Sequence, residues 1–311
     1  MKILYLCNRM YHRQKLSRGR FDTMAAIAQR ATVKFSGVGF DDWDEASPAQ
    51  QNIDRIMPRA DLVVWYKPLE MNDPRGVRIP TCLRYNEMWD EGWTWREIAA
   101  SGTRLVVCHH GNDCRRYEGK VSGPTLVHVP HGVSPGFDSE NKTCTIDALL
   151  TGATDENHYP LRCRFRRLIE SGKIPGMVVS HPGYRVENPA AQRRVYSGLL
   201  ARAKIALVSS SRHQYALAKY VEAALAGCLL VGDVPDDRQR QFKRFMVVVR
   251  PNDCDDVIAG RVRWWLQNDR ARQIRADVGR RTMLDGYTAD HYARRFLESA
   301  RQFLAKRGVV R

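Results

Sequence analysis

The most informative segment of the chain reads Lys204-Ile-Ala-Leu-Val-Ser-Ser-Ser-Arg-His-Gln-Tyr-Ala-Leu-Ala-Lys-Tyr-Val-Glu-Ala-Ala-Leu-Ala-Gly-Cys-Leu-Leu-Val-Gly-Asp-Val-Pro235. It predicts a strand, a polar loop, a helix closed by Gly227 and a second strand. The loop at residues 209–212 offers hydroxyls, amides and one guanidinium just before a helix, where an anion such as phosphate binds. Lys219 and Glu222 share one helix face and suit a phosphate and a vicinal diol, respectively. The alternative for this pair is a surface ion pair.

On both sides of this segment, short apolar runs alternate with helical stretches, which is typical of parallel sheets flanked by helices. A Gly/Pro cluster at residues 130–136 predicts a linker between two such units. We therefore expect an α/β protein with two doubly wound, Rossmann-like domains, residues 1–136 and 137–311, that face each other across a cleft. The predicted strands lie at residues 2–7, 32–37, 62–66, 81–85, 104–108, 125–129, 145–150, 176–180, 204–208 and 228–231.

A family resemblance is carried by Lys219-Tyr-Val-Glu-Ala-Ala-Leu-Ala-Gly-Cys-Leu-Leu-Val-Gly232. This run resembles the nucleotide-sugar signature of group 1 glycosyltransferases with the two-domain GT-B fold, especially the branch related to the spore maturation protein CgeB. The second acidic residue of that signature binds ribose hydroxyls and falls on Glu222, whereas the first falls on Gln214 and departs from the pattern. Residues 128–137, 147–162 and 178–184 are similar to further segments of the family.

The resemblance implies a hexosyl- or pentosyltransferase that needs no bound metal or cofactor and retains the anomeric configuration. Its co-substrate would be a nucleoside-diphosphate sugar, here a UDP-sugar, with Arg162 at the diphosphate. The implied donor-binding residues are Gly152, Arg162, Tyr184, Ser210, Arg212, Gln214, Tyr215, Lys219 and Glu222. For the other arginines between Arg162 and Arg167 we expect only a solvated helix face.

Acceptor chemistry is expected at the end of the predicted strand 81–85, in the N-terminal domain. Glu87 and Asp90 follow that strand, and either carboxylate could deprotonate an acceptor hydroxyl. The alternative is that one of them caps the next helix. Trp89 stands in an aromatic cluster with Met88, Trp93 and Trp95, which either packs in the core or stacks on a sugar or an extruded base.

Two further patterns bear on metal binding and on location. Cys108-His-His-Gly-Asn-Asp-Cys114 has zinc-ligating residue types but no second Cys/His pair, so the alternative is a sheet-edge histidine that accepts a proton. No apolar run reaches the ~20 residues of a membrane span, and Asn8-Arg9 interrupts the N-terminal run before a secretory segment forms. We therefore expect a cytoplasmic protein without stable membrane association, located in the host cytoplasm if phage-encoded.

The charge balance points to the acceptor. The 311 residues carry 50 Lys and Arg against 34 Asp and Glu, a net charge of +16, which exceeds what one diphosphate needs. Further basic clusters lie at residues 238–244 and 261–281. The cluster after the first strand contains no acid and is predicted to bind an acceptor backbone: Arg9, Arg13, Lys15, Arg18 and Arg20.

The leading hypothesis is transfer of a sugar to the hydroxyl of a hydroxymethylated pyrimidine in DNA, as phage enzymes of this fold perform. Such a base must be flipped out of the duplex to react. One alternative is a glycosyltransferase that acts on a cell-surface glycan, lipid or protein. Another is a non-catalytic nucleic-acid-binding protein that has kept the fold.

Overall fold

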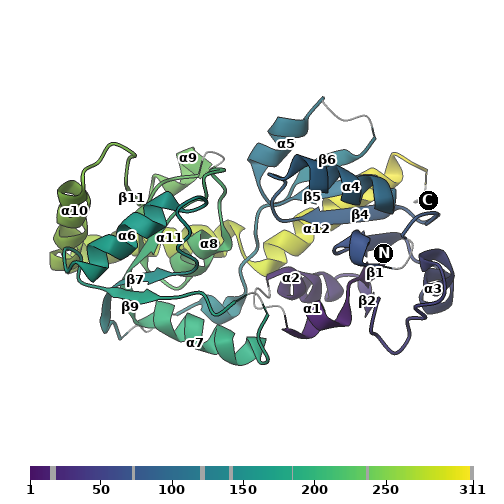
Figure 1. The fold of residues 1–311 in the computed structure, drawn as a ribbon, viewed down its shortest axis with the longest axis horizontal. Helices are drawn as coiled ribbons and strands as arrows, with labels where there is room; N and C mark the ends of the chain where they lie inside the picture. Colours follow the sequence, from purple (N-terminus) through teal and green to yellow (C-terminus); the bar gives the residue numbers. More distant parts are fainter. Residues whose placement is uncertain are drawn as a thin grey trace. The chain divides into compact units, whose positions relative to one another are not determined.

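The structure is a computed structural model that describes residues 1–14, 19–71, 74–119, 123–139, 143–183, 185–235 and 238–308, without the side chain of Arg20 (Figure 1). It divides into two compact units. The first comprises Met1–Pro130 together with Ala289–Arg311, and the second comprises His131–Thr288. Within the described ranges, no helix combines the length and apolar character needed to cross a membrane.

The first unit contains a six-stranded parallel sheet in the order β2-β1-β3-β4-β5-β6. Alternating residues of each strand point to opposite faces, so Ile3 and Tyr5 belong to one core and Leu4 and Leu6 to the other. The strands are β1 (Lys2–Leu6), β2 (Thr32–Ser36), β3 (Leu62–Trp65), β4 (Thr81–Tyr85), β5 (Leu105–Cys108) and β6 (Thr125–His128). Its helices are α1 (Arg9–Gln14), α2 (Gly19–Ala28), α3 (Ala49–Ile56), α4 (Glu91–Ser101), α5 (Gly111–Tyr117) and α12 (Ala289–Ala305), with the 3-10 turn η1 (Pro68–Glu70).

The second unit contains a five-stranded parallel sheet in the order β11-β10-β9-β7-β8. Both faces are again covered by helices, as the apolar strand sequences require. The strands are β7 (Ile146–Thr151), β8 (Met177–Val179), β9 (Ala203–Val208), β10 (Leu229–Gly232) and β11 (Val247–Val248). The helices are α6 (Pro160–Glu170), α7 (Pro189–Arg202), α8 (Ala218–Leu225), α9 (Gln239–Phe242), α10 (Asp255–Gln267) and α11 (Asp269–Gly286), with the 3-10 turn η2 (Pro135–Phe137).

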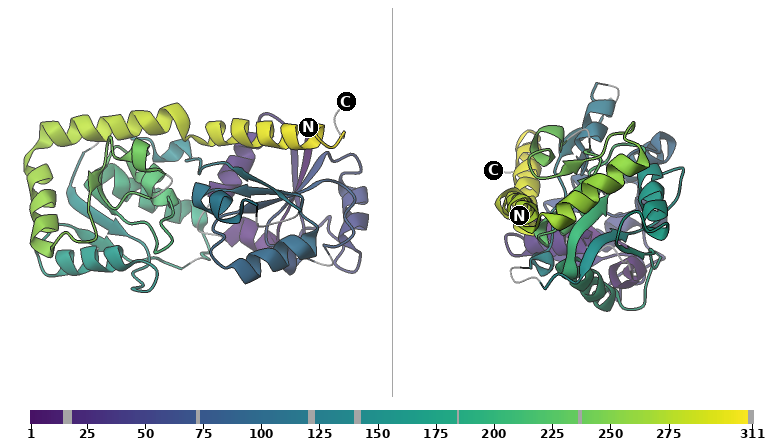
Figure 2. Two further views of the ribbon diagram at one scale, coloured as in Figure 1. Left: turned by 90° about the horizontal axis from the view of Figure 1, so that it is seen from above. Right: turned by 90° about the vertical axis from the view of Figure 1, so that its left-hand side faces the viewer.

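The last helix departs from the expected domain boundary, which assigned the whole C-terminal tail to the second domain. Helix α12 packs beside α2 in the first unit (Figure 2). Tyr292 and Phe296 are buried in the same core as Tyr5, and the Arg84 guanidinium on β4 donates a 2.9 Å hydrogen bond to the Tyr292 hydroxyl. The apolar face of α12 is therefore used to complete the core of the first unit.

Candidate functional site

The candidate site lies at the carboxyl end of the second sheet, where the neighbouring strands β7, β9 and β10 end. Strand β7 ends at Thr151 and is followed by Gly152, while β9 leads into the serine loop at residues 209–211. Helix α8 begins shortly after that loop and carries Lys219 and Glu222. Ligands of open α/β sheets collect at this edge. The segments that the sequence singled out are thus brought together here.

Two cations meet at Gly152. The Lys219 Nζ donates a 3.1 Å hydrogen bond to the Thr151 hydroxyl. Arg162, on α6, is only 3% exposed and donates a 2.9 Å bond to the carbonyl of Ala153. Gly152 has φ +109°, and a Cβ at this position would lie 2.9 Å from Lys219 Cε and 3.1 Å from Arg162 Nη1. Only glycine therefore allows both cations to approach the end of β7.

These two cations lack acidic partners. Among the described residues, neither Arg162 nor Lys219 forms an ion pair with a carboxylate. Burial lowers the pKa of Arg162, which still remains charged. Burial also lowers the pKa of Lys219 to about 8, opposed by Glu222 and reinforced by the charge of Arg162. Such a desolvated pair of positive charges, with no carboxylate in contact, is costly without a ligand and favours an anion.

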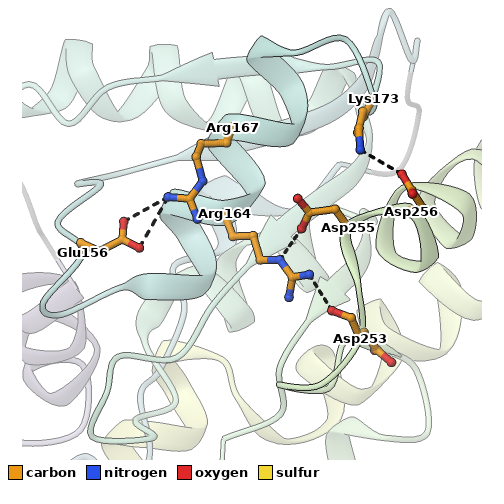
Figure 3. A network of polar contacts seen from close by, with 7 residues as sticks. All are labelled: Glu156, Arg164, Arg167, Lys173, Asp253, Asp255 and Asp256. Atoms are coloured by element: carbon orange, nitrogen blue, oxygen red, sulfur yellow. Dashed lines mark hydrogen bonds and ion pairs between the residues drawn. The ribbon is translucent and has the colours of Figure 1, made fainter.

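The neighbouring arginines of α6 behave differently (Figure 3). Arg164 lies 2.5 Å from a carboxylate oxygen of Asp255 and also donates to the carbonyl of Asp253. Arg167 pairs with Glu156 at 3.3 Å. Arg166 pairs with Glu170 at 2.6 Å. Arg166 and Arg167 lie on the solvated helix face that the sequence predicted, whereas Arg164 is half-buried; all three are ion-paired. Arg162 alone among the four is buried and lacks a carboxylate partner.

Glu222 lies beside a residue that the sequence did not single out, Tyr196 on α7. Burial and the charge of Glu222 raise the pKa of Tyr196, whose hydroxyl is in hydrogen-bonding reach of Thr151 and Glu222. The Lys219 Nζ lies 4.9 Å from the centroid of the Tyr196 ring. A cavity of ≈ 10 Å³, about the size of one water, is lined partly by Thr151, Tyr196 and Lys219. Tyr196 has no motif around it, so only the fold reveals its place.

The serine loop is buried, but its members differ in what they can offer a ligand. Ser210 donates its amide to Asp233 at 2.9 Å and its hydroxyl to the same carboxylate, so both groups are engaged. Burial raises the pKa of Asp233, whereas its hydrogen bonds with Ser210 and Tyr220 oppose the shift. The Ser209 hydroxyl is buried and has no hydrogen-bond partner in the described part of the chain. Ser209 therefore keeps a hydrogen-bonding group that Ser210 has already engaged.

Three of the remaining predicted donor residues follow this loop, and the fourth lies outside the described residues. Arg212 is exposed, and its Nε donates to His213 at 3.2 Å. Gln214 has φ +58°, a left-handed conformation that is uncommon for residues other than glycine. Tyr215 is fully buried. Tyr184 lies outside the described residues.

The predicted basic acceptor cluster is only partly described. Arg9 forms two contacts with Asp41, at 2.5 and 3.2 Å, and donates to the carbonyl of Gly39. Its charge is thus compensated locally. Arg13, on α1, is exposed and forms no ion pair with a described residue. Lys15, Arg18 and the side chain of Arg20 lie outside the described residues.

The aromatic cluster after β4 is divided between the core and the surface. Met88 is fully buried, and the Trp95 ring packs edge-on against Tyr117 at 5.2 Å between centroids. Trp89 and Trp93 are instead 39% and 41% exposed. Glu87 is partly buried, and it accepts a long, 3.4 Å hydrogen bond from the side chain of Asn86.

Asp90 caps helix α4, as the alternative interpretation expected, because its carboxylate accepts a 2.9 Å hydrogen bond from the Trp93 amide. Asp90→Ala should lower the free energy of unfolding by about 1 kcal/mol in urea denaturation. Asp90→Ser keeps a capping oxygen without the carboxylate and should restore most of that loss. If the serine variant is stable but loses all glycosyl transfer, Asp90 acts in catalysis as well as in capping.

The Cys/His segment lies inside the first unit. His109 and His110 are buried, and the His109 Nδ1 lies 3.0 Å from the carbonyl oxygen of Val129. The Cys108 thiol contacts the sulfur of Met88 at 3.3 Å. Across the described ranges, no three His, Cys, Asp or Glu side chains gather in an arrangement that could hold a metal ion.

Comparison with known proteins bears on the family and the fold. Residues 164–298 match the family described as glycosyl transferase-like. No curated protein matches the chain in sequence. An alpha-glucosyltransferase solved with UDP and a 13-mer DNA containing an HMU base superposes with TM-score 0.66 at 8% identity, covering 96% of this chain and 99% of that chain.

Two further solved structures show the same likeness. A glycosyltransferase from Rickettsia africae superposes with TM-score 0.62 at 12% identity, with 97% and 98% of the two chains covered. HepE from Anabaena, solved with UDP and glucose, superposes with TM-score 0.61 at 11% identity, with 97% and 100% covered. The chain thus has the GT-B fold of glycosyltransferases, which confirms the predicted fold class. Its second unit contains most of the glycosyl transferase-like match.

Proposed function

We propose that the protein is a glycosyltransferase that takes its sugar from a UDP-sugar bound at the carboxyl edge of the second sheet. The observation that carries this proposal is the pair of uncompensated cations, Arg162 and Lys219, at Gly152. A diphosphate supplies the negative charge that this pair lacks. Glu222 accepts hydrogen bonds from the ribose hydroxyls, and Tyr196 holds that carboxylate in place.

The chemical step requires charge compensation on the leaving group. As the bond between the sugar and the diphosphate breaks, negative charge grows on the UDP oxygen, and Arg162 and Lys219 stabilise it without a metal ion. The acceptor hydroxyl oxygen bonds to the anomeric carbon, and Glu87 is the candidate to accept its proton. Retention of configuration is proposed from the family resemblance.

For the acceptor, we propose a hydroxymethylated pyrimidine in DNA. The net charge of +16 favours a polyanion. Exposed cations of α1 and of the segment around α9 extend this charge over the surface: Arg13, Arg240, Lys243 and Arg244. The alpha-glucosyltransferase solved with DNA is a structural neighbour of the whole chain. That enzyme was solved with a DNA containing an HMU base, which supports a hydroxymethylated pyrimidine as the acceptor class for this chain.

The test is incubation with radiolabelled UDP-sugars and matched DNA duplexes that carry either hydroxymethylated or ordinary pyrimidines. We expect label only in the hydroxymethylated duplex. Donor hydrolysis without labelled DNA would contradict the DNA acceptor and favour a glycan, lipid or protein acceptor. Absence of both UDP binding and donor hydrolysis would contradict the glycosyltransferase itself and leave the nucleic-acid-binding alternative.

A further inference from the structure

An exposed aromatic surface lies where strand β4 ends in the first unit. We define the tryptophan platform as Leu69, Trp89 and Trp93, which are 39%, 39% and 41% exposed. Helix α4, which carries Trp93, packs against the 3-10 turn that carries Leu69. Large aromatic side chains that stay partly exposed at the ligand edge of a sheet are candidates for a binding surface.

The segment that contains Trp89 is fixed by contacts of the preceding residue, Met88, with helix α5 and strand β5. The Met88 amide donates a 3.0 Å hydrogen bond to the buried carboxylate of Asp113, and the Met88 carbonyl accepts a 2.6 Å bond from the Tyr117 hydroxyl. The Met88 side chain is fully buried against Cys108. Helix α5 therefore fixes the backbone of the segment that contains Glu87 and Trp89. Because this segment is already ordered, less conformational entropy is lost when a ligand binds to it.

Trp93 is also fixed, from its own helix. The Asp90 cap holds the first turn of α4, and the Arg96 guanidinium lies 5.0 Å from the centroid of the Trp93 ring. The two tryptophans are thus four residues apart across an ordered helix start. Each ring is thus carried by an ordered backbone and keeps part of its surface exposed for stacking.

The charges around the platform decide what kind of ligand it takes. Three carboxylates, those of Glu87, Asp90 and Glu91, stand in the same stretch of chain as one cation, Arg96. This local excess of negative charge along the chain disfavours a phosphodiester, although the whole protein is strongly basic. The carboxylates accept hydrogen bonds from the hydroxyl and N–H groups of an uncharged ring. The ligand is therefore the uncharged part of an acceptor whose phosphates bind elsewhere.

We propose that the tryptophan platform stacks the extruded, hydroxymethylated pyrimidine of the acceptor DNA. This inference rests on the proposed function and locates the base within the first unit. Arginines and lysines elsewhere on the protein bind the phosphate backbone of the DNA. The platform binds the base and brings its hydroxyl near Glu87.

The experiment compares Trp89→Ala, Trp93→Ala and the double variant in the full chain. Trp264→Ala is the matched control, because Trp264 is 50% exposed and lies in the second unit. Transfer to hydroxymethylated duplex gives KM and kcat, calorimetry gives the affinity for UDP, and a salt titration gives the slope of DNA affinity. The uncharged nucleoside 5-hydroxymethyl-2′-deoxyuridine is the direct probe of the platform.

We expect the double variant to raise KM for DNA about tenfold or more and to lose nucleoside binding. UDP affinity and the salt slope should stay unchanged, because neither the donor site nor the phosphate contacts are altered. Trp89→Tyr should recover most of the loss, and Trp264→Ala should resemble the parent protein. An unchanged KM, or a reduced salt slope, would overturn the proposal.

The failure of the platform can be distinguished from the failure of the proposed function. If the parent protein binds UDP but transfers no sugar to DNA, the DNA acceptor is wrong, and the nucleoside titration still tests the platform. Absence of nucleoside binding overturns the platform. Binding of a neutral oligosaccharide that Trp89→Ala abolishes also overturns the base assignment, because the platform would then serve a glycan.

Discussion

Replacing Arg162 by methionine is expected to weaken UDP binding by at least about 30-fold, with the free energy of unfolding unchanged or increased. The guanidinium is buried, and its partners among the described residues are the Ala153 carbonyl and the Tyr159 ring, whose centroid lies 3.9 Å from the guanidinium carbon. Its desolvation therefore destabilises the free protein, and the negative charge of a bound ligand offsets this penalty. Methionine fills the same space without a charge and removes both the cost and the affinity. Calorimetry with UDP and urea denaturation measure the two effects.

The matched control for this change is Arg164→Met on the same helix. Arg164 is paired with Asp255, so this variant should bind UDP like the parent protein and lose a little stability. A residue that merely supported the fold would show the opposite pattern at position 162, with a large loss of stability and normal UDP affinity. That result would remove the main argument for the donor site.

UDP affinity is also expected to fall as the pH rises through about 8, the pKa to which burial lowers Lys219. Only the protonated amine attracts the diphosphate, whose last ionisation lies near pH 6 and is complete above pH 7. Above pH 8, each unit should weaken binding by up to about tenfold, with uptake of one proton. Calorimetry from pH 7 to 9 in two buffers measures both quantities. Lys219→Arg should bind UDP with a flat profile, since arginine stays charged.

The same lysine has a predictable effect on folding. Its pKa in the folded protein is lower than the 10.5 of an ordinary lysine, so between pH 8 and 10.5 the unfolded chain holds more protons. The contribution of Lys219 to the free energy of unfolding should therefore increase as pH rises through this window.

A pH profile of UDP binding that is the same in the parent protein and in Lys219→Arg would contradict the role of Lys219 in binding the diphosphate.

Most of the fold could be predicted because buried parallel strands leave continuous apolar runs in the sequence. Strand β3 lies at Leu62–Trp65 and β5 at Leu105–Cys108, within a residue of expectation. Strand β11, at Val247–Val248, is too short to give such a signal. The destination of α12 could not be predicted either, because an apolar helix face does not say which of two sheets it will cover.

The site was predictable where a local motif carried it. Lys219 of α8 was found from its three-residue spacing to Glu222, whereas Gly152 and Arg162 came from the resemblance. Residues whose role depends on a distant partner were not. Tyr196 reaches Glu222 from another helix, Ser210 is engaged by Asp233, and Arg9 is neutralised by Asp41. These pairings depend on tertiary structure, which sequence spacing does not encode.

The route of the chain through its two units has a consequence for biosynthesis. The sheet of the first unit is translated first, but the helix that covers one of its faces, α12, follows only after the whole second unit. A ribosome-bound nascent chain must therefore carry an unsealed apolar face while residues 131–288 are being made and folded. Chaperone capture should concentrate on that face and end when the final helix emerges.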